Sequence, residues 1–157
     1  MAGTNQVYPK FAENRADGTL GDLFDVTGDR DYILIPLTVS YTYSAAHSTV
    51  ADLTNEVAGD AQRATLAGVD KEIDEDDLYI TTTTDLATIS SGAAITYRKV
   101  ALALKTAAAN DATSYLVSLF TFDADQTGTQ VSLTSNKTPV GDANFIHKTT
   151  VAETVYS

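Results

Sequence analysis

Four consecutive acidic residues, Asp74, Glu75, Asp76 and Asp77, form the densest charge cluster of the chain. Carboxylate oxygens are the ligands that a hard cation such as Ca²⁺ prefers, and such a cation takes several of them. The cluster does not follow the EF-hand spacing, because it has no central glycine and no glutamate twelve positions from its first aspartate. A short acidic run is more often a solvated turn. We therefore predict a solvated turn and no metal site, and cation binding at these four residues stays open as the alternative.

The remaining candidates for chemistry are two histidines and one pair of aspartates. His47 and His147 are the only histidines, and no Gly-x-Ser-x-Gly surrounds Ser48 or any other serine. Asp123 and Asp125 flank a predicted turn, where aspartates bond to nearby backbone, whereas a glycosidase would need two carboxyl groups facing each other across a cleft. The chain has no phosphate-binding glycine loop and no cysteine. We predict no catalytic residue, no cofactor and no enzyme activity.

Charge and hydropathy narrow the choice of partners. The chain of 157 residues has 21 acidic and 10 basic side chains, which gives a net charge of -11. A surface this acidic repels phosphate backbones, so we predict no nucleic-acid partner. No apolar run reaches the roughly 20 residues that span a bilayer, so we predict no membrane partner. A chain of this length is typical of one domain.

Alternation of apolar and polar residues with a period of two predicts a β-hairpin between residues 95 and 122. In the first strand, one face would carry Val100, Leu102 and Leu104, and the other Lys99, Ala101, Ala103 and Lys105. In the second strand, one face would carry Leu116, Ser118, Phe120 and Phe122, and the other Tyr115, Val117, Leu119 and Thr121. Asn110 and Asp111 would lie in the connection, since both tolerate turn geometry. The alternative is a helix over residues 100–110, because alanine and leucine favour helices.

Further strands are predicted from the same pattern. They are residues 32–41, 63–66, 69–73, 78–84 and 130–134. Pro36 cannot donate to a ladder, so the first of these strands should have a bulge or an edge there. By alternation Tyr41 and Tyr43 would lie on one side of that strand, either in the core or as a contact patch. The tail from Phe145 is also strand-prone, and it would either close the sheet or leave the body as an arm.

Helical structure is expected in two short places. Residues 7–16 form one or two turns, with Pro9 in the first turn, where its missing N–H costs nothing. Ser48 or Thr49 caps a second turn, with Asp52 near its positive end. Residues 1–6 are expected to be irregular. The chain is thus predicted to be all-β: a single-domain antiparallel sandwich or jelly-roll-like body over residues 1–157, with one or two short helical segments and with contact arms at residues 1–26 and 143–157.

Several segments resemble those of small virion proteins of tailed bacteriophages, in the same order and at similar spacing. They are residues 7–11 (VYPKF), 41–57 (YTYSAAHSTVADLTNEV), 76–77 (DD), 97–104 (YRKVALAL) and 112–117 (ATSYLV). Together they cover most of residues 7–125. The resemblance implies a small β-rich structural component of the particle and no catalytic residue. After Phe122 the chain departs from the family, which often closes with a short strand containing tryptophan, whereas this tail is longer and has none.

The resemblance leads to the expectation of a capsid decoration (cement) protein. It would bind the outside of the virion. Its expected partners are the major capsid protein and further copies of itself, with which it would form a homotrimer. The expected contact residues are Val7, Tyr8, Phe11, Leu20, Phe24, Phe145, Ile146, Val151, Val155 and Tyr156. The alternatives are a neck, tail or fibre-associated virion protein, a carbohydrate- or host-surface-binding module, and a hydrolase.

Overall fold

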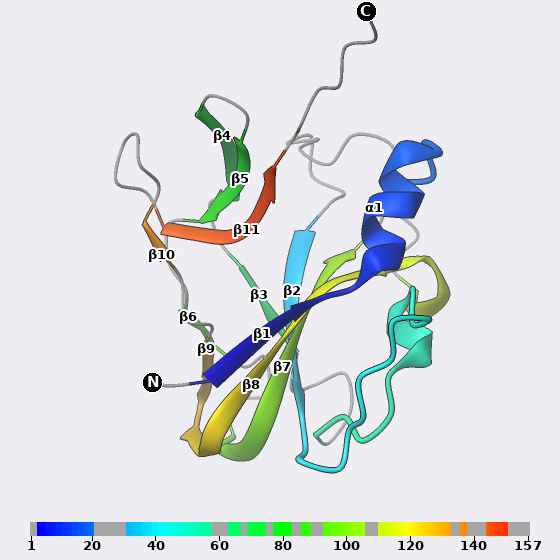
Figure 1. Ribbon diagram of the computed structural model, residues 1–157. Coiled ribbons are helices and arrows are strands. Elements are labelled where there is room, and N and C mark those ends of the chain that lie inside the picture. Colours follow the sequence, from blue (N-terminus) through cyan, green and yellow to red (C-terminus); the bar gives the residue numbers. More distant parts are fainter. Residues whose placement is uncertain are drawn as a thin grey trace, which may run out of the picture.

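A computed structural model describes residues 3–20, 31–57, 63–66, 69–74, 77–82, 86–88, 93–105, 110–132, 136–137 and 144–150. Within these residues the fold is all-β and its strands are antiparallel, with one α-helix and short 3₁₀ turns, as the sequence predicts. Figure 1 shows a long central hairpin, with the helix near one end of it and a smaller group of strands beside it.

The largest sheet has five strands in the order β1-β8-β7-β2-β3 (Figure 1). Their bounds are Gly3–Val7 for β1, Asp31–Leu37 for β2, Ala64–Thr65 for β3, Ile95–Lys105 for β7 and Tyr115–Gly128 for β8. β7 is the central strand and pairs with both β8 and β2. The predicted hairpin is confirmed. The helical alternative is wrong for residues 100–105, because residues 100–104 are paired on both sides and Lys105 pairs with Asp31.

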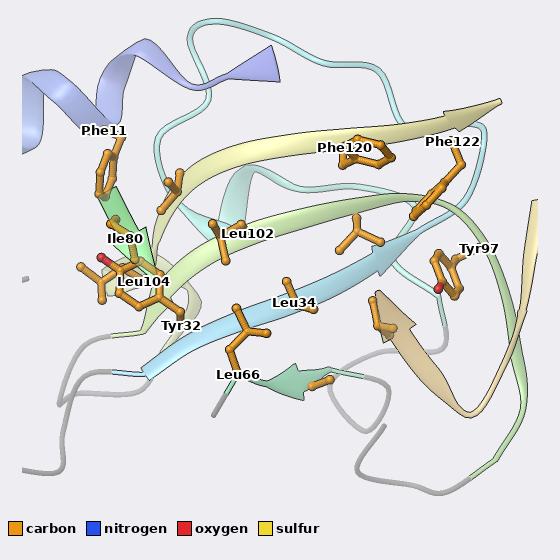
Figure 2. Packing of buried hydrophobic residues seen from close by; sticks show 14 of the residues in the cluster. Phe11, Tyr32, Leu34, Leu66, Ile80, Tyr97, Leu102, Leu104, Phe120 and Phe122 are labelled. Atoms are coloured by element: carbon orange, nitrogen blue, oxygen red, sulfur yellow. The ribbon is translucent and has the colours of Figure 1, made fainter. Parts of the chain in front are cut away.

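Two smaller sheets complete the β structure. One has the order β10-β11-β5-β4, and the other pairs β6 with β9. Their bounds are Asp70–Asp74 for β4, Asp77–Thr82 for β5, Leu86–Thr88 for β6, Gln130–Ser132 for β9, Asn136–Lys137 for β10 and Asn144–Thr150 for β11. Ile80 of β5 is buried in the same cluster as Leu104 and Tyr32, so the four-stranded sheet contacts one face of the larger sheet (Figure 2).

The helical elements lie close to where the sequence predicts them. They are α1 (Pro9–Ala16) and the 3₁₀ turns η1 (Val50–Asp52) and η3 (Asp111–Thr113). Pro9 is the first residue of α1, and the carboxylate of Asp52 accepts hydrogen bonds from the N–H groups of Ser48 and Thr49 at 2.8 and 2.9 Å. Asn110 caps η3 within the hairpin connection. Both predicted helical segments are thereby confirmed, except that the first begins at Pro9 rather than at Val7, which belongs to β1.

Alternation assigns the residues of β7 to its two faces correctly, and over residues 100–104 both faces are buried. Val100, Leu102 and Leu104 belong to one core cluster, and Ala101 and Ala103 belong to the other. The first cluster (Figure 2) is closed by residues that include Phe11, Leu20, Leu66 and Ile80, and the second by Tyr8, Tyr41 and Val50. Residues 38–57 therefore cover one face of the sheet, while α1 and β5 contribute to the other.

The predicted alternation in the partner strand β8 is correct for Leu119, Phe120 and Phe122 but wrong for Leu116 and Val117, because the strand contains a bulge. Leu102 pairs with Ser118 and Ala103 pairs with Leu116, which leaves Val117 as an extra residue on β8. Val117 accordingly lies in the first core cluster, whereas Leu116 lies in the second. A bulge of this kind shifts the side chains of one strand relative to its partner and increases the local twist.

The predicted turn at residues 123–128 is also wrong, since β8 continues through it to Gly128. Tyr97 pairs with Gln126 beyond an irregularity at Arg98, where four residues of β8 lie opposite a single residue of β7. The Nε of Arg98 donates to the carbonyl of Phe122 at 3.0 Å, and its Nη1 lies 3.4 Å from Asp125. Residues 126–128 of β8 pair with residues 95–97 of β7, so the ladder resumes where a turn was predicted.

The apolar strand β2 is buried along almost its whole length, but it ends at Leu37 rather than at Tyr41. Pro36 pairs with Val100 on one side, while on the other side β3 pairs only with Ile33 and Leu34. The proline thus lies beyond the end of the second ladder, as its missing N–H predicts, and its carbonyl accepts a hydrogen bond from the N–H of Val57 at 3.0 Å. Beyond Leu37 the chain turns, and residues 41–44 are irregular rather than extended in a sheet.

Candidate functional site

The strand β1 forms one outer edge of the five-stranded sheet. It pairs with β8 over five residues in continuous register, from Gly3 opposite Phe122 to Val7 opposite Ser118. All five residues of β1 are exposed, and none is charged. Among the residues that the structure describes, no strand pairs with the other side of β1. The sheet therefore presents a regular polar backbone edge to its surroundings.

Hydrogen bonding fixes which backbone groups point outward. The N–H of Tyr8 donates to the carbonyl of Val117 at 3.0 Å, so Tyr8 directs its backbone toward β8. Because the direction alternates along an antiparallel strand, Gly3, Asn5 and Val7 direct theirs away from β8. The carbonyl of Val7 accordingly accepts a hydrogen bond from the Tyr43 hydroxyl at 2.7 Å. The outer edge thus offers the N–H and C=O groups of Gly3 and Asn5 and the N–H of Val7.

The other sheet edges in the described part of the chain are short or charged. β3 and β10 have two residues each, and β6 and β9 have three. β10 covers only two residues of β11 and β1 covers only five residues of β8, but the uncovered parts of these two edges carry charge, Lys148 in β11 and Asp123 and Asp125 in β8. β4 is five residues long but has the sequence DKEID, in which four residues are charged. Short length and charged side chains are the usual protection of an edge against unwanted pairing. β1 alone among these described edges has neither protection, which is typical of an edge that pairs with another chain.

Gly3 is required by a close approach at this edge. A Cβ atom at Gly3 would lie 2.3 Å from the carbonyl oxygen of Thr121 and 2.8 Å from the ring of Phe120. The Phe120 ring therefore occupies the space that a side chain at position 3 would take, and it packs edge-on against Phe122 with centroids 4.7 Å apart (Figure 2). The glycine lets an aromatic ring of the core come close to the outer edge of the sheet.

A network of tyrosines fixes the end of β1. The hydroxyl of Tyr8 lies 2.9 Å from that of Tyr41, which lies 2.8 Å from Nδ1 of His47. The rings of Tyr8 and Tyr43 are 5.2 Å apart between centroids. Lys99 donates to the carbonyl of Tyr41, so it is tied to the same loop. These contacts join β1 to residues 41–47 and to β7, which gives the edge a fixed position.

The electrostatics of this network oppose ionisation of its phenols. Burial, together with the hydrogen bond to Tyr41, raises the pKa of Tyr8 well above the usual range of a tyrosine. Burial also raises the pKa of Tyr41, against the opposing effect of its hydrogen bond to Tyr8. The pKa of Asp52 is lowered, chiefly by the N–H of Thr49. The hydroxyls of Tyr8 and Tyr41 are therefore neutral and the carboxylate of Asp52 is ionised, an arrangement that suits a structural role.

Replacing Tyr8 with phenylalanine is expected to lower the free energy of unfolding by about 1 kcal/mol at neutral pH, because Tyr41 loses its buried partner. The pKa of Tyr8 is higher in the folded protein than in the unfolded chain, where it is near 10. Its stabilising contribution is therefore complete below about pH 10 and is lost as the pH rises above about 10 toward the folded pKa. The native protein should therefore lose stability above about pH 10 more steeply than the variant. Urea unfolding at pH 7 and pH 10.5 measures both effects. Tyr115→Phe, which lies outside the network, is the control. An equal loss of unfolding free energy between pH 7 and pH 10.5 in the native protein and in Tyr8→Phe would contradict the account.

The expected contact residues fall into three groups. Val7 is 53% exposed at the end of β1. Tyr8, Phe11 and Leu20 are almost completely buried, so these three serve the protein's own core and cannot reach a partner in this structure. Of the others, Phe145 and Ile146 lie in β11, and Phe24, Val151, Val155 and Tyr156 fall outside the described residues.

The candidates for chemistry do not gather into a site. His47 is bonded to Tyr41, and His147 lies far along the chain in β11. Asp123 and Asp125 are exposed on β8. Asp74 and Asp77 pair at the end of the β4–β5 hairpin, while Glu75 and Asp76 lie outside the described residues. Within the described ranges, no three acidic or histidine side chains are placed to hold a metal ion.

Sequence reasoning missed β1, which was expected to be irregular. The segment GTNQV has one apolar residue and no alternation, so the pattern that indicates a half-buried strand is absent. Its lack of charge in so acidic a chain was the available signal.

Comparisons with known proteins identify no relative of this chain. The chain matches no protein-family model, no curated protein and no solved structure. In the part of the chain that the structure describes, no helix is long and apolar enough to span a membrane.

Proposed function

We propose that this chain is a structural protein of a tailed-bacteriophage particle, a decoration protein that binds the outer face of the shell built by the major capsid protein. The observation that carries the proposal is the edge at β1, a regular, exposed and uncharged strand in a protein of net charge -11. Such an edge suits assembly with other protein chains through strand addition. The resemblance of residues 7–125 to small virion proteins supports a particle as the place of assembly.

The function would be mechanical rather than chemical. A protein that binds only the intact lattice stabilises it by mass action, by about 2.7 kcal/mol per site when the free protein is at 100 times its Kd. An oligomer that holds two shell subunits at once gains further, because the second contact forms at a high effective concentration. The tyrosine network supports this role, since it fixes β1 on a buried core and so limits the ordering that binding would cost.

The proposal predicts saturable binding to shells. Purified chain added to shells that lack it should co-sediment with them up to a fixed ratio to the shell protein. The temperature at which the filled shells rupture should rise as the bound amount rises. Asn5→Pro, which disturbs the outer edge, should bind more weakly than Asn5→Thr, which keeps the backbone N–H. Sedimentation without saturation, or saturation without any change in rupture temperature, would contradict a decoration role.

A further inference from the structure

We propose that the outer edge of β1 pairs with β1 of a second copy, antiparallel and across a two-fold axis at Asn5. This inference deepens the proposed function, on which it rests for its biological setting, by naming the partner at the same edge. The contact would join two five-stranded sheets into one continuous sheet. It is isologous, so each copy contributes the same residues to both halves of the interface.

The register follows from the backbone directions. Gly3, Asn5 and Val7 all direct their N–H and C=O groups outward. The carbonyl of Val7 already accepts a hydrogen bond from the Tyr43 hydroxyl, so a facing N–H would use the second lone pair of that oxygen. In an antiparallel pair of two copies, the only register that matches all three places Gly3 opposite Val7 of the second copy and Asn5 opposite Asn5. A shift by two residues in either direction matches only two outward residues of each copy, and a shift by one matches none. The five-residue strand is thus complementary to itself at this one register.

Side chains agree with that register. Gly3, Asn5 and Val7 lie on the sheet face of the first core cluster, since the Phe120 ring fills the space above Gly3. Val7 is 53% exposed on the same face. With Gly3 opposite Val7, the exposed valine of each copy meets the Phe120 ring of the other across the glycine. The two most apolar features of the edge would therefore cover each other.

Charge favours this strand over the edge of β4 as a contact between copies. Two molecules that each carry -11 repel each other, and the repulsion is smallest where the facing strands carry no charge. β1 has none, whereas the edge of β4 would place Asp70, Glu72 and Asp74 against the same residues of a second copy. A self-contact through β1 therefore avoids like-charge pairs across the interface.

A single cysteine tests the register, because the chain has none of its own. Directly opposed residues in a hydrogen-bonded antiparallel pair have Cα atoms about 5.5 Å apart, within disulfide range. Asn5→Cys should form a disulfide-linked dimer under mild oxidation. Gln6→Cys should not, because Gln6 lies opposite Thr4, and the two Gln6 positions are offset beyond the roughly 7 Å limit. Cross-linking of Gln6→Cys in preference to Asn5→Cys would overturn the register.

A second experiment tests the contact in the unmodified chain. Light scattering after gel filtration should give twice the chain mass of 16.7 kDa for the native protein and for Asn5→Thr. Asn5→Pro removes an outward N–H while leaving the pairing with β8 intact, as edge strands allow. It should lower the association constant by at least about tenfold, since both hydrogen bonds at the axis are lost. A monomeric native protein, or a trimer that Asn5→Pro leaves unchanged, would overturn the proposal.

The outcomes separate this inference from the proposed function. Dimers that form through β1 but do not bind shells would refute the decoration role and keep the two-fold contact. Saturable binding to shells by a chain that stays monomeric would do the reverse. The expected homotrimer is a third arrangement, and the measured mass distinguishes it directly from a dimer.

Discussion

Replacing Leu102 with alanine is expected to lower the free energy of unfolding by about 2–5 kcal/mol. Leu102 is completely buried in the middle of β7, with strands paired on both sides. The substitution removes three carbon atoms from a densely packed cluster, and β8 and β2 prevent β7 from collapsing into the space. Because a domain of this size typically has only about 5–15 kcal/mol of stability, the loss is a large share of the total.

Urea unfolding of the native protein and of Leu102→Ala measures this loss. Asp123→Ala, on an exposed part of the neighbouring strand β8, serves as the control and should change the stability by no more than about 0.5 kcal/mol. The slope of free energy against urea should be the same for all three proteins, since the fold is unchanged. A loss below about 1 kcal/mol for Leu102→Ala would place the core of the protein elsewhere.

Replacing Arg63 with alanine is expected to cost about 2 kcal/mol, the second largest effect. Its guanidinium binds two carboxylates, with contacts of 2.7 and 2.9 Å to Glu56 and of 2.7 and 3.1 Å to Asp111. Arg63 and Glu56 are only 15% and 17% exposed, whereas Asp111 is 45% exposed, so the loss is smaller than for a fully buried cluster. The substitution leaves two adjacent carboxylates without their cation.

The contribution of Arg63 should depend on pH in a defined direction. The hydrogen bond from Arg63 lowers the pKa of Asp111 below its usual value. The pKa of Asp111 is lower in the folded protein than in the unfolded chain, where it is near 3.9. Its stabilising contribution is therefore complete above that value and is lost as the pH falls through the folded pKa. The stability difference between the native protein and Arg63→Ala should therefore shrink below about pH 4. Unfolding of these two proteins and of Asp111→Asn at pH 3 and pH 7 measures it, and a difference that grows on acidification would contradict the assignment.

The central hairpin could be predicted because both of its strands are buried on at least one face over most of their length. Alternation in β7 placed Val100 and Ala101 on opposite faces correctly, since burial imposes a period of two. The bulge at Val117 could not be predicted, because its side chain is apolar and suits either face of a sheet that is buried on both. The continuation of β8 beyond Asp123 depends on pairing with a distant strand, whereas turn propensity reports only the local preference of Asp and Gly.

The candidate site could be predicted only in part. Apolar residues near the N-terminus suggested a contact surface, but Tyr8, Phe11 and Leu20 are buried in the protein's own core. An apolar side chain near a chain end is equally suited to packing inside and to binding outside, so residue type alone does not distinguish the two. The edge at β1 is a property of unpaired backbone, which becomes visible only when the neighbours of the strand are known.

The central claim is that the chain decorates the shell of a phage particle. Its most direct test is the number of copies per purified particle, measured by quantitative mass spectrometry against the major capsid protein. The account predicts a number comparable with that of the shell subunits, in a fixed ratio set by the symmetry of the lattice. A few copies per particle would contradict it and favour a neck, tail or fibre position, and complete absence from the particle would refute the virion assignment.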